Sequence, residues 1–240
     1  MNDLELASAC AAEIAIAVEN YELLQAVKQA FKDFASDMVK TMEAKHPITA
    51  GHSQRVTTYT MFLAEKMGFG FQDMELCNYA CLLHDIGKIA IPDSILTKPN
   101  RFSNEERKIM ESHALWTKRI LEEVKLPREL EALPIVASSH HERLNGSGYP
   151  FGLSGNEIPL PARIMAITDV FDALTSRRDY PKYDEQHTGN ADPFDLERVF
   201  HILQKGEGIH FDADICELFY TNRKGLEVLM RKLHETPKQG

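Results

Sequence analysis

Cys81-Leu82-Leu83-His84-Asp85-Ile86-Gly87-Lys88 ends an apolar helical run with a histidine and an aspartate side by side. Neighbouring residues on a helix point about 100° apart. Both side chains can therefore reach one metal ion only near a helix end, which we expect Gly87 to supply. A carboxylate in this position can bridge two cations, with one oxygen to each. The pair alone is weak as a signal, because helix ends often carry polar residues. The positively charged side chain of Lys88 would point to where an anionic substrate sits.

Further residues of the metal-binding kind stand on at least three other segments: His52, His113, His140, His141 and Asp169. The apolar spacing around Asp169 predicts a buried helix, where an aspartate is costly without a cation or hydrogen-bond partners. Together with His84 and Asp85 these residues predict a two-metal hydrolytic site, which would act on a phosphoryl group. We expect the other histidines to be ordinary surface or core residues: His46, His187, His201, His210 and His234.

The composition is that of one sizeable globular domain with an additional element. The chain has 240 residues and a net charge of -9, which argues against long DNA or RNA as a ligand but allows a small phosphorylated one. No apolar run has the length of a membrane span, and Met1–Glu5 lacks the pattern of a signal peptide. The four cysteines form no CxxC pair. We therefore expect a cytoplasmic protein with reduced thiols.

Residues 1–45 read as one long helix without proline or glycine. A heptad seam of mostly apolar residues alternates steps of three and four: Ala17, Asn20, Leu24, Val27, Phe31, Phe34, Met38 and Thr41. This pattern is typical of a parallel coiled coil. A polar Asn20 on the seam can fix its register. Two interpretations stand: a linker that dimerises and carries a signal, or a helix that packs its apolar face on its own domain.

Residues 46–235 read as an all-α domain. We expect helices at 52–67, 72–87, 103–111, 113–124, 127–142, 159–176, 193–205 and 211–234, with His113 beginning one and His140-His141-Glu142 ending another. Ser103 and Glu106 form a capping-box pattern. The segment 145–155 contains four glycines and a proline, so we expect a long ordered loop, which in a compact domain is usually functional.

Taken together, these stretches resemble an HD-GYP domain, a branch of the HD phosphohydrolase superfamily. The matching stretches are Gly51-His52-Ser53-Gln54-Arg55-Val56, His84-Asp85-Ile86-Gly87-Lys88, His113, His140-His141-Glu142, Gly148-Tyr149-Pro150, Ile158–Ile164, Asp169–Arg178 and His210-Phe211-Asp212. They run from about residue 45 to 220 in the family's order. The resemblance implies a helical bundle and a metal-dependent phosphodiesterase acting on cyclic di-GMP, which gives pGpG or GMP.

The resemblance also implies roles by position. The first metal would be held by His52, His84, Asp85 and Asp169, and the second by Asp85, His113, His140 and His141. Iron or manganese is the metal most often used, although ligand chemistry alone does not choose between them and zinc. A hydroxide bridging the metals would attack phosphorus in line. Lys88 would stabilise phosphoryl charge or protonate the leaving oxygen, and Arg178 would contact a phosphate. Side chains that would orient the histidines are Arg55, Glu142 and Asp172.

The loop Gly148-Tyr149-Pro150 would form part of the substrate wall or a surface for a partner such as a diguanylate cyclase. The chain departs from the family pattern at three places. Ile48 replaces a metal-binding glutamate, so we expect two metals rather than three. Asn145 replaces an aspartate. In Arg178-Asp179-Tyr180-Pro181-Lys182 the second basic residue lies one position away from its place in the family pattern. Either Lys182 takes over that role through a shifted turn, or a contact to a substrate phosphate is lost.

Other interpretations remain open. Ala15–Asn20 resembles the last helix of a GAF sensory domain, which would make this chain the output part of a longer receptor. The substrate can be another cyclic dinucleotide such as cyclic GMP-AMP. The domain can also be a catalytically weak module that binds nucleotides or partners, or a di-iron oxygenase on the same scaffold, which Lys88 and the Gly-Tyr-Pro loop disfavour.

Overall fold

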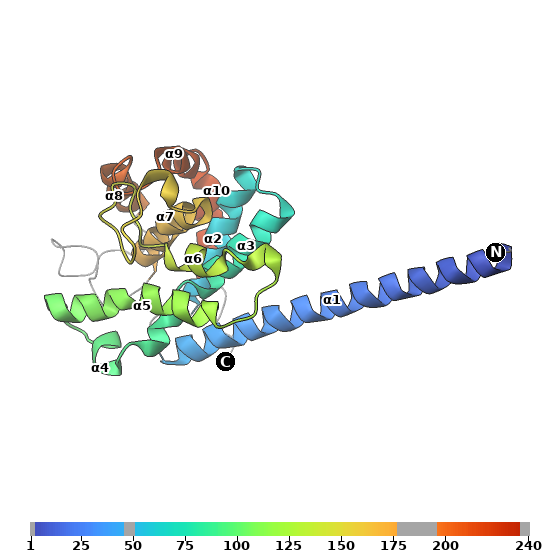
Figure 1. Ribbon diagram of the computed structural model, residues 1–240. Helices are drawn as coiled ribbons and strands as arrows, with labels where there is room; N and C mark the ends of the chain where they lie inside the picture. The colour runs from blue at the N-terminus through green and yellow to red at the C-terminus, as the bar shows by residue number, and fades with distance from the viewer. Residues whose placement is uncertain (1–2, 46–50, 177–195, 236–240) are drawn as a thin grey trace. The chain divides into compact units, whose positions relative to one another are not determined.

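The structure, a computed structural model, describes residues 3–45, 51–176 and 196–235. Over these ranges the chain is helical and no strand occurs, which confirms the expected all-α fold (Figure 1). The helices are α1 (Asp3–Lys45), α2 (His52–Lys66), α3 (Phe71–Leu83), α4 (Asp93–Leu96), α5 (Asn104–Glu122), α6 (Leu133–Ser138), α7 (Leu160–Thr175), α8 (Leu196–Gly206), α9 (Ala213–Thr221) and α10 (Arg223–Glu235). The described residues also include the 3-10 helices η2 (Ile86–Ala90), η3 (Arg128–Leu130) and η4 (Gly155–Glu157).

The chain forms two compact units, Met1–Met38 and Val39–Gly240, and the division falls inside α1. In the first unit, the seam residues Leu24, Val27 and Phe34 are exposed. The last turn of α1 belongs to the second unit, where Val39 and Met42 are buried. None of the described helices combines the length and the apolar character that a membrane crossing requires.

The core of the second unit lies around α2 and α7. Helix α2 packs against α3, α7 and α10, while α5 packs against η2 and α6 (Figure 1). Three buried aromatic rings run through the centre: Tyr59 meets Phe171 at a centroid distance of 4.9 Å, and Phe171 meets Phe219 at 5.2 Å, both edge to face. Burial of these large apolar surfaces is the main stabilising contribution to the bundle. It fixes α7, and with it Asp169, against α2.

Several helix boundaries differ from those expected. Residues 104–122 form one helix rather than two, because neither glycine nor proline interrupts it before His113. Helix α6 ends at Ser138, and the hydroxyl groups of Ser138 and Ser139 bond to carbonyls of the preceding turn. Such bonds compete with the helix ladder. His140 and His141 therefore follow α6 instead of ending it.

Two further boundaries are corrected. Helix α3 stops at Leu83, ahead of the expected residue 87, and the chain continues into η2. The segment 211–234 divides at Asn222, whose side-chain amide bonds to the carbonyl of Leu218.

Two sequence patterns noted above stabilise the fold and do not take part in the site. Asp212 caps α9 by accepting from the backbone N–H groups of Asp214 and Ile215, and its other oxygen lies 2.7 Å from Nη1 of Arg163 on α7. This connection joins the beginnings of α7 and α9 through a charge-assisted hydrogen bond. The capping box expected at Ser103 and Glu106 is present at the beginning of α5, with both reciprocal bonds formed.

Candidate metal centre

Seven imidazole and carboxylate side chains from five parts of the fold meet in one buried cluster. His52 is the first residue of α2, His84 and Asp85 lie between α3 and η2, His113 is in the middle of α5, and Asp169 is on α7. His140 and His141 follow α6. Three groups of side chains have ligand atoms close enough to share a metal ion: His52, His84 and Asp169; His84, Asp85 and His140; and His113, His140 and His141.

Asp85 stands between the two ends of the cluster. Its Oδ2 lies 3.4 Å from Nε2 of His84 and 3.8 Å from Nε2 of His52. Its Oδ1 lies 3.4 Å from Nε2 of His113 and 4.0 Å from Nε2 of His140. Each carboxylate oxygen thus faces a different set of histidines. A carboxylate in this position could contact a different cation through each of its oxygens.

The backbone sets the orientation of three of these rings in the same way. Nδ1 of His84, His113 and His140 lies 2.6 to 2.7 Å from the carbonyl oxygen three residues earlier. A carbonyl oxygen only accepts, so each Nδ1 carries the hydrogen and each Nε2 presents its lone pair. Such bonds fix the tautomer of a metal-binding histidine and raise its basicity.

The resulting cluster consists of acceptors that face one another. Nε2 of His113 and Nε2 of His140 are 3.4 Å apart although both carry lone pairs. Nε2 of His52 lies 3.1 Å from Oδ1 of Asp169, and buried Nε2 of His84 has no hydrogen-bond partner among the described residues. A buried group of lone pairs is unfavourable unless a cation or protons lie between them. The residues present therefore fit divalent metal ions, for which neutral imidazoles and carboxylates are suitable ligands.

Asp172 and Arg55 support the cluster from the side of α2 and α7. Oδ2 of Asp172 lies 2.7 Å from Nδ1 of His52, and Nε of Arg55 donates to Oδ1 of Asp172 at 2.7 Å. Arg55 thus balances the charge of a fully buried carboxylate that orients His52. Glu142 does not orient a histidine as expected. It accepts from the backbone N–H groups of Phe151 and Leu153, at 2.7 and 3.0 Å, and so holds the loop after α6.

Thr117 is a residue that the sequence analysis missed. Its hydroxyl donates to the carbonyl of His84 at 2.8 Å and accepts from N–H of Gly87 at 3.0 Å. It thereby ties the turn at His84 and Asp85 to α5, one helical turn after His113. Gly87 makes this approach possible: a Cβ there would lie 2.0 Å from the carbonyl oxygen of His113. The place of Thr117 four residues after His113, on the same face of the helix, is a signal that a sequence analysis can use.

The Gly-Tyr-Pro loop lies beside the second set of histidines. The ring centroids of Tyr149 and His141 are 4.7 Å apart. Gly148 packs against the backbone of residues 142–143, where a Cβ would come within 2.5 Å of main-chain atoms. Asn145 bonds through Oδ1 to N–H and Oγ of Ser147, so the amide preserves a local turn.

Of the other predicted site residues, Lys88 forms an ion pair with Oδ2 of Asp85, and its side chain is largely buried. Arg178 and Lys182 lie outside the described residues, as does Ile48.

The protonation of the cluster differs between its two ends. Burial lowers the pKa of His113 to about 4 and that of His141 to about 3. Burial also acts to lower the pKa of His84, but the carboxylates of Asp85 and Asp169 outweigh it and raise that pKa overall. For Asp85, burial opposes ionisation, yet Lys88 and His84 hold the pKa of the carboxyl well below its usual range. The carboxylate is therefore charged at neutral pH.

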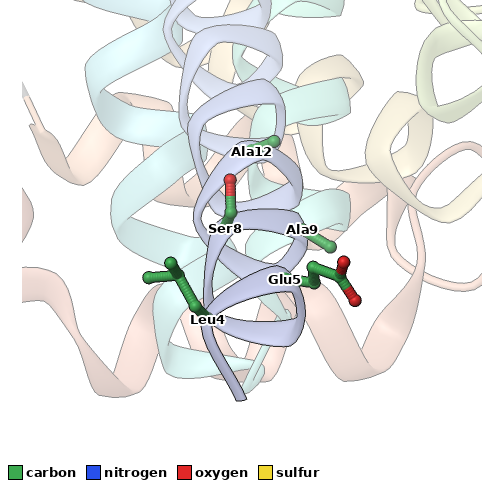
Figure 2. Close-up of a pocket in the computed structure, with 5 residues that line it drawn as sticks. All are labelled: Leu4, Glu5, Ser8, Ala9 and Ala12. Carbon is green, nitrogen blue, oxygen red and sulfur yellow. The ribbon is translucent and has the colours of Figure 1, made fainter. Parts of the chain in front are cut away.

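A surface hollow elsewhere on the molecule has a different character. It is lined by Leu4, Glu5, Ser8, Ala9 and Ala12, all from the beginning of α1 (Figure 2). All five side chains come from successive turns of one helix, and their mixture of small, apolar and acidic groups suggests no particular ligand. We assign no function to this hollow.

Comparison with known proteins matches this architecture. The chain spans 37% of the length of a 3'3'-cGAMP-specific phosphodiesterase of Vibrio cholerae, to which it is 36% identical over 85% of its own residues. It spans 53% of a cyclic di-GMP phosphodiesterase of Thermotoga maritima, with 34% identity over 84% of the chain. A solved HDG"Y"P protein from Bdellovibrio bacteriovorus shares the fold, with a TM-score of 0.55 at 19% identity over 72% of this chain and 52% of that one. The family model for the HD domain matches residues 37–215 of the 240, and the chain therefore belongs to the HD domain family, as its HD-GYP resemblance predicted.

Proposed function

We propose that this chain is a metal-dependent phosphodiesterase that hydrolyses cyclic di-GMP to pGpG or GMP. The observation that carries the proposal is the position of Asp85, whose two carboxylate oxygens face two separate sets of buried histidines. In this proposal one cation is held by His52, His84, Asp85 and Asp169, and the other by Asp85, His113, His140 and His141. Iron or manganese suits these mixed ligands.

Two such cations supply Lewis-acid polarisation of the phosphoryl group and a nucleophile from water at neutral pH. The chain's own groups complete the chemistry. Lys88 places its ammonium next to Asp85, from where it stabilises negative charge on the phosphoryl oxygens or protonates the leaving oxygen. Tyr149 and Gly148 border the second set of histidines, and the Tyr149 ring offers a flat face to a base. Arg178 and Lys182 are proposed to bind the substrate phosphates.

A second candidate substrate is 3'3'-cGAMP. The relative from Vibrio cholerae named for that activity and the relative from Thermotoga maritima named for cyclic di-GMP are almost equally similar to this chain. The two nucleotides differ in one base, so the groups around Tyr149 rather than the metal cluster would distinguish them.

The proposed partners follow from surfaces outside the metal cluster. The exposed seam residues Leu24, Val27 and Phe34 on α1 support a homodimer formed through this helix. The loop at Tyr149 is a proposed contact for a diguanylate cyclase. A cytoplasmic location is proposed because Cys77, Cys81 and Cys216 are buried free thiols, which are typical of reducing compartments. The likeness of Ala15–Asn20 to a GAF helix stays a prediction.

The test is anaerobic turnover by protein whose bound metal has been counted. The protein is loaded with manganese or iron, incubated in parallel with cyclic di-GMP and 3'3'-cGAMP, and the products are separated by chromatography. Two metals per chain together with pGpG or GMP would support the proposal. Faster loss of 3'3'-cGAMP would favour the second substrate, whereas two metals with no product from either nucleotide would refute the enzyme proposal.

A further inference from the structure

The last residue of α1, Lys45, contacts the segment that carries Lys88. Its Nζ donates to the carbonyl oxygens of Ile89 at 2.9 Å and Ile91 at 3.0 Å, and lies 3.2 Å from Oδ1 of Asp93. These three oxygens match the three donors of an ammonium group. They all belong to the five residues that follow Lys88, within the same compact unit as Lys45.

This segment is packed at its two ends, where Ile86 and Ile91 are buried and η2 lies against α5, but its middle is less well held. η2 is a single 3-10 turn, in which Lys88 N–H bonds to the carbonyl of Asp85 at 2.9 Å and Ile91 N–H bonds to the carbonyl of Lys88 at 3.1 Å. Bonds in a 3-10 turn have poorer geometry than those of an α-helix. The side chain of Ile89 is exposed, so the core does not hold this part of the turn. Lys45 attaches this exposed middle of the segment to the end of α1 through the carbonyl of Ile89.

The end of α1 that carries Lys45 is itself packed against the core. Val39, Met42 and Lys45 follow one another at intervals of three residues, so they lie along one face of α1. Val39 and Met42 are buried, which anchors the turn from which Lys45 extends. The ammonium is therefore presented from a packed helix end rather than from a loose surface side chain.

We propose that Lys45 is a positioning residue for Lys88, which makes the last turn of α1 a working part of the site. Lys45 touches none of the proposed metal ligands. It holds the main chain on the far side of Lys88, so that the Lys88 ammonium stays aligned beside Asp85. A movement of the end of α1 would then shift the main chain that follows Lys88. The role of Lys88 in turnover rests on the proposed function, but the restraint on its main chain does not.

The experiment compares Lys45→Met, which keeps the length and removes the charge, with Lys45→Arg, which keeps the charge. Lys98→Met is the matched control. Lys98 binds Glu106 at 2.6 and 2.7 Å, and its side chain is 27% exposed against 30% for Lys45. Lys45→Gln is prepared alongside so that the comparison does not depend on the folding of one variant. Hydrogen exchange over residues 86–96, metal content, kcat and KM are measured for each folded protein.

For Lys45→Met and Lys45→Gln we expect faster exchange at the amides of Lys88 and Ile91 and a kcat lowered about tenfold, as for a misplaced catalytic group. KM and metal content should stay unchanged. Lys45→Arg should keep most of the wild-type exchange protection and most of the wild-type kcat. Lys98→Met should change neither quantity. Unchanged exchange in the Lys45 variants, or an equal change in Lys98→Met, would overturn the proposal. If the wild type turns over no cyclic dinucleotide, the proposed function fails while hydrogen exchange still decides whether Lys45 restrains Lys88.

Discussion

Asp172 on α7 lies 2.7 Å from Nδ1 of His52 on α2, and it is the group that turns Nε2 of that ring toward Asp169. Asp172 is fully buried, and Arg55 keeps it charged through two hydrogen bonds. Burial alone would raise the pKa of the Asp172 carboxyl, but His52 and Arg55 lower it overall. An ionised acceptor behind His52 fixes the ring in the tautomer that can bind a metal.

Replacing Asp172 by Asn should weaken binding at the first metal position. The amide accepts from His52 less strongly, so we expect an affinity about 10 to 100 times lower there. The second position should bind as before, since none of its histidines contacts Asp172. Calorimetric titration of metal-free protein with manganese measures both.

The matched control for this variant is Asp212→Asn. It removes the charge of another Asp–Arg pair, with Arg163, outside the metal cluster. This variant should lose some stability and keep its metal affinity. Equal weakening in both variants would mean that Asp172 acts through stability alone.

Replacing Asp85 by Ala should affect both metal positions together, because its two oxygens face different histidines. We expect fewer than two metals per chain and a kcat lowered by about 10³-fold or more, while the helical circular dichroism is preserved. Elemental analysis and turnover measure these effects. Asp73→Asn, an exposed change in the first turn of α3, serves as the control. Full metal content and normal turnover in Asp85→Ala would contradict the bridging role.

Replacing Gly87 by Ala should destabilise the protein. The new Cβ would lie 2.0 Å from the carbonyl oxygen of His113 and 2.4 Å from the backbone nitrogen of Thr117, so η2 and α5 must separate. We expect the free energy of unfolding to fall by about 3 kcal/mol, as in a severely overpacked core. Urea denaturation measures it. Gly70→Ala is the control, since its nearest neighbour lies 3.9 Å away. A loss of similar size in both variants would argue against tight packing at Gly87.

The two metal positions should lose their ions at different pH. A proton competes with a metal only where the pKa of the imidazole exceeds the pH. The pKa of His84 is raised, whereas those of His113 and His141 are lowered to about 4 and about 3. On acidification, we expect the first position to release its metal between about pH 7 and 5.5 and the second only below about pH 5.

Metal content after dialysis across this range measures the difference. In His141→Ala, which damages the second position, the remaining metal should leave at the higher pH. Release from the second position first would contradict the assignment.

The sequence predicted the all-α class and the seven side chains that the fold brings together, and the structure explains where other expectations failed. His84 and Asp85 are informative only together with the histidines and the aspartate on the other segments. Thr117 and Lys45 were missed because a hydroxyl and a surface lysine are common side chains, and their importance comes from contacts 33 and 44 residues away. The boundaries of α5 and α6 failed for a local reason. The residue types around His113, Ser138 and Ser139 do not distinguish a helix end from a helix interior.

The seven proposed ligands are dispersed over α2, the turn after α3, α5, the turn after α6, and α7, and this has a thermodynamic consequence. An unfolded chain cannot bring these groups together, so cations that bind here bind the folded chain almost exclusively. Each ion adds about RT ln(1 + [L]/Kd) to the free energy of unfolding, which is about 2.7 kcal/mol at a free concentration one hundred times Kd. A chelator would then lower the melting temperature as well as stop turnover. The concentration of free metal in the cell would then affect the lifetime of the folded protein.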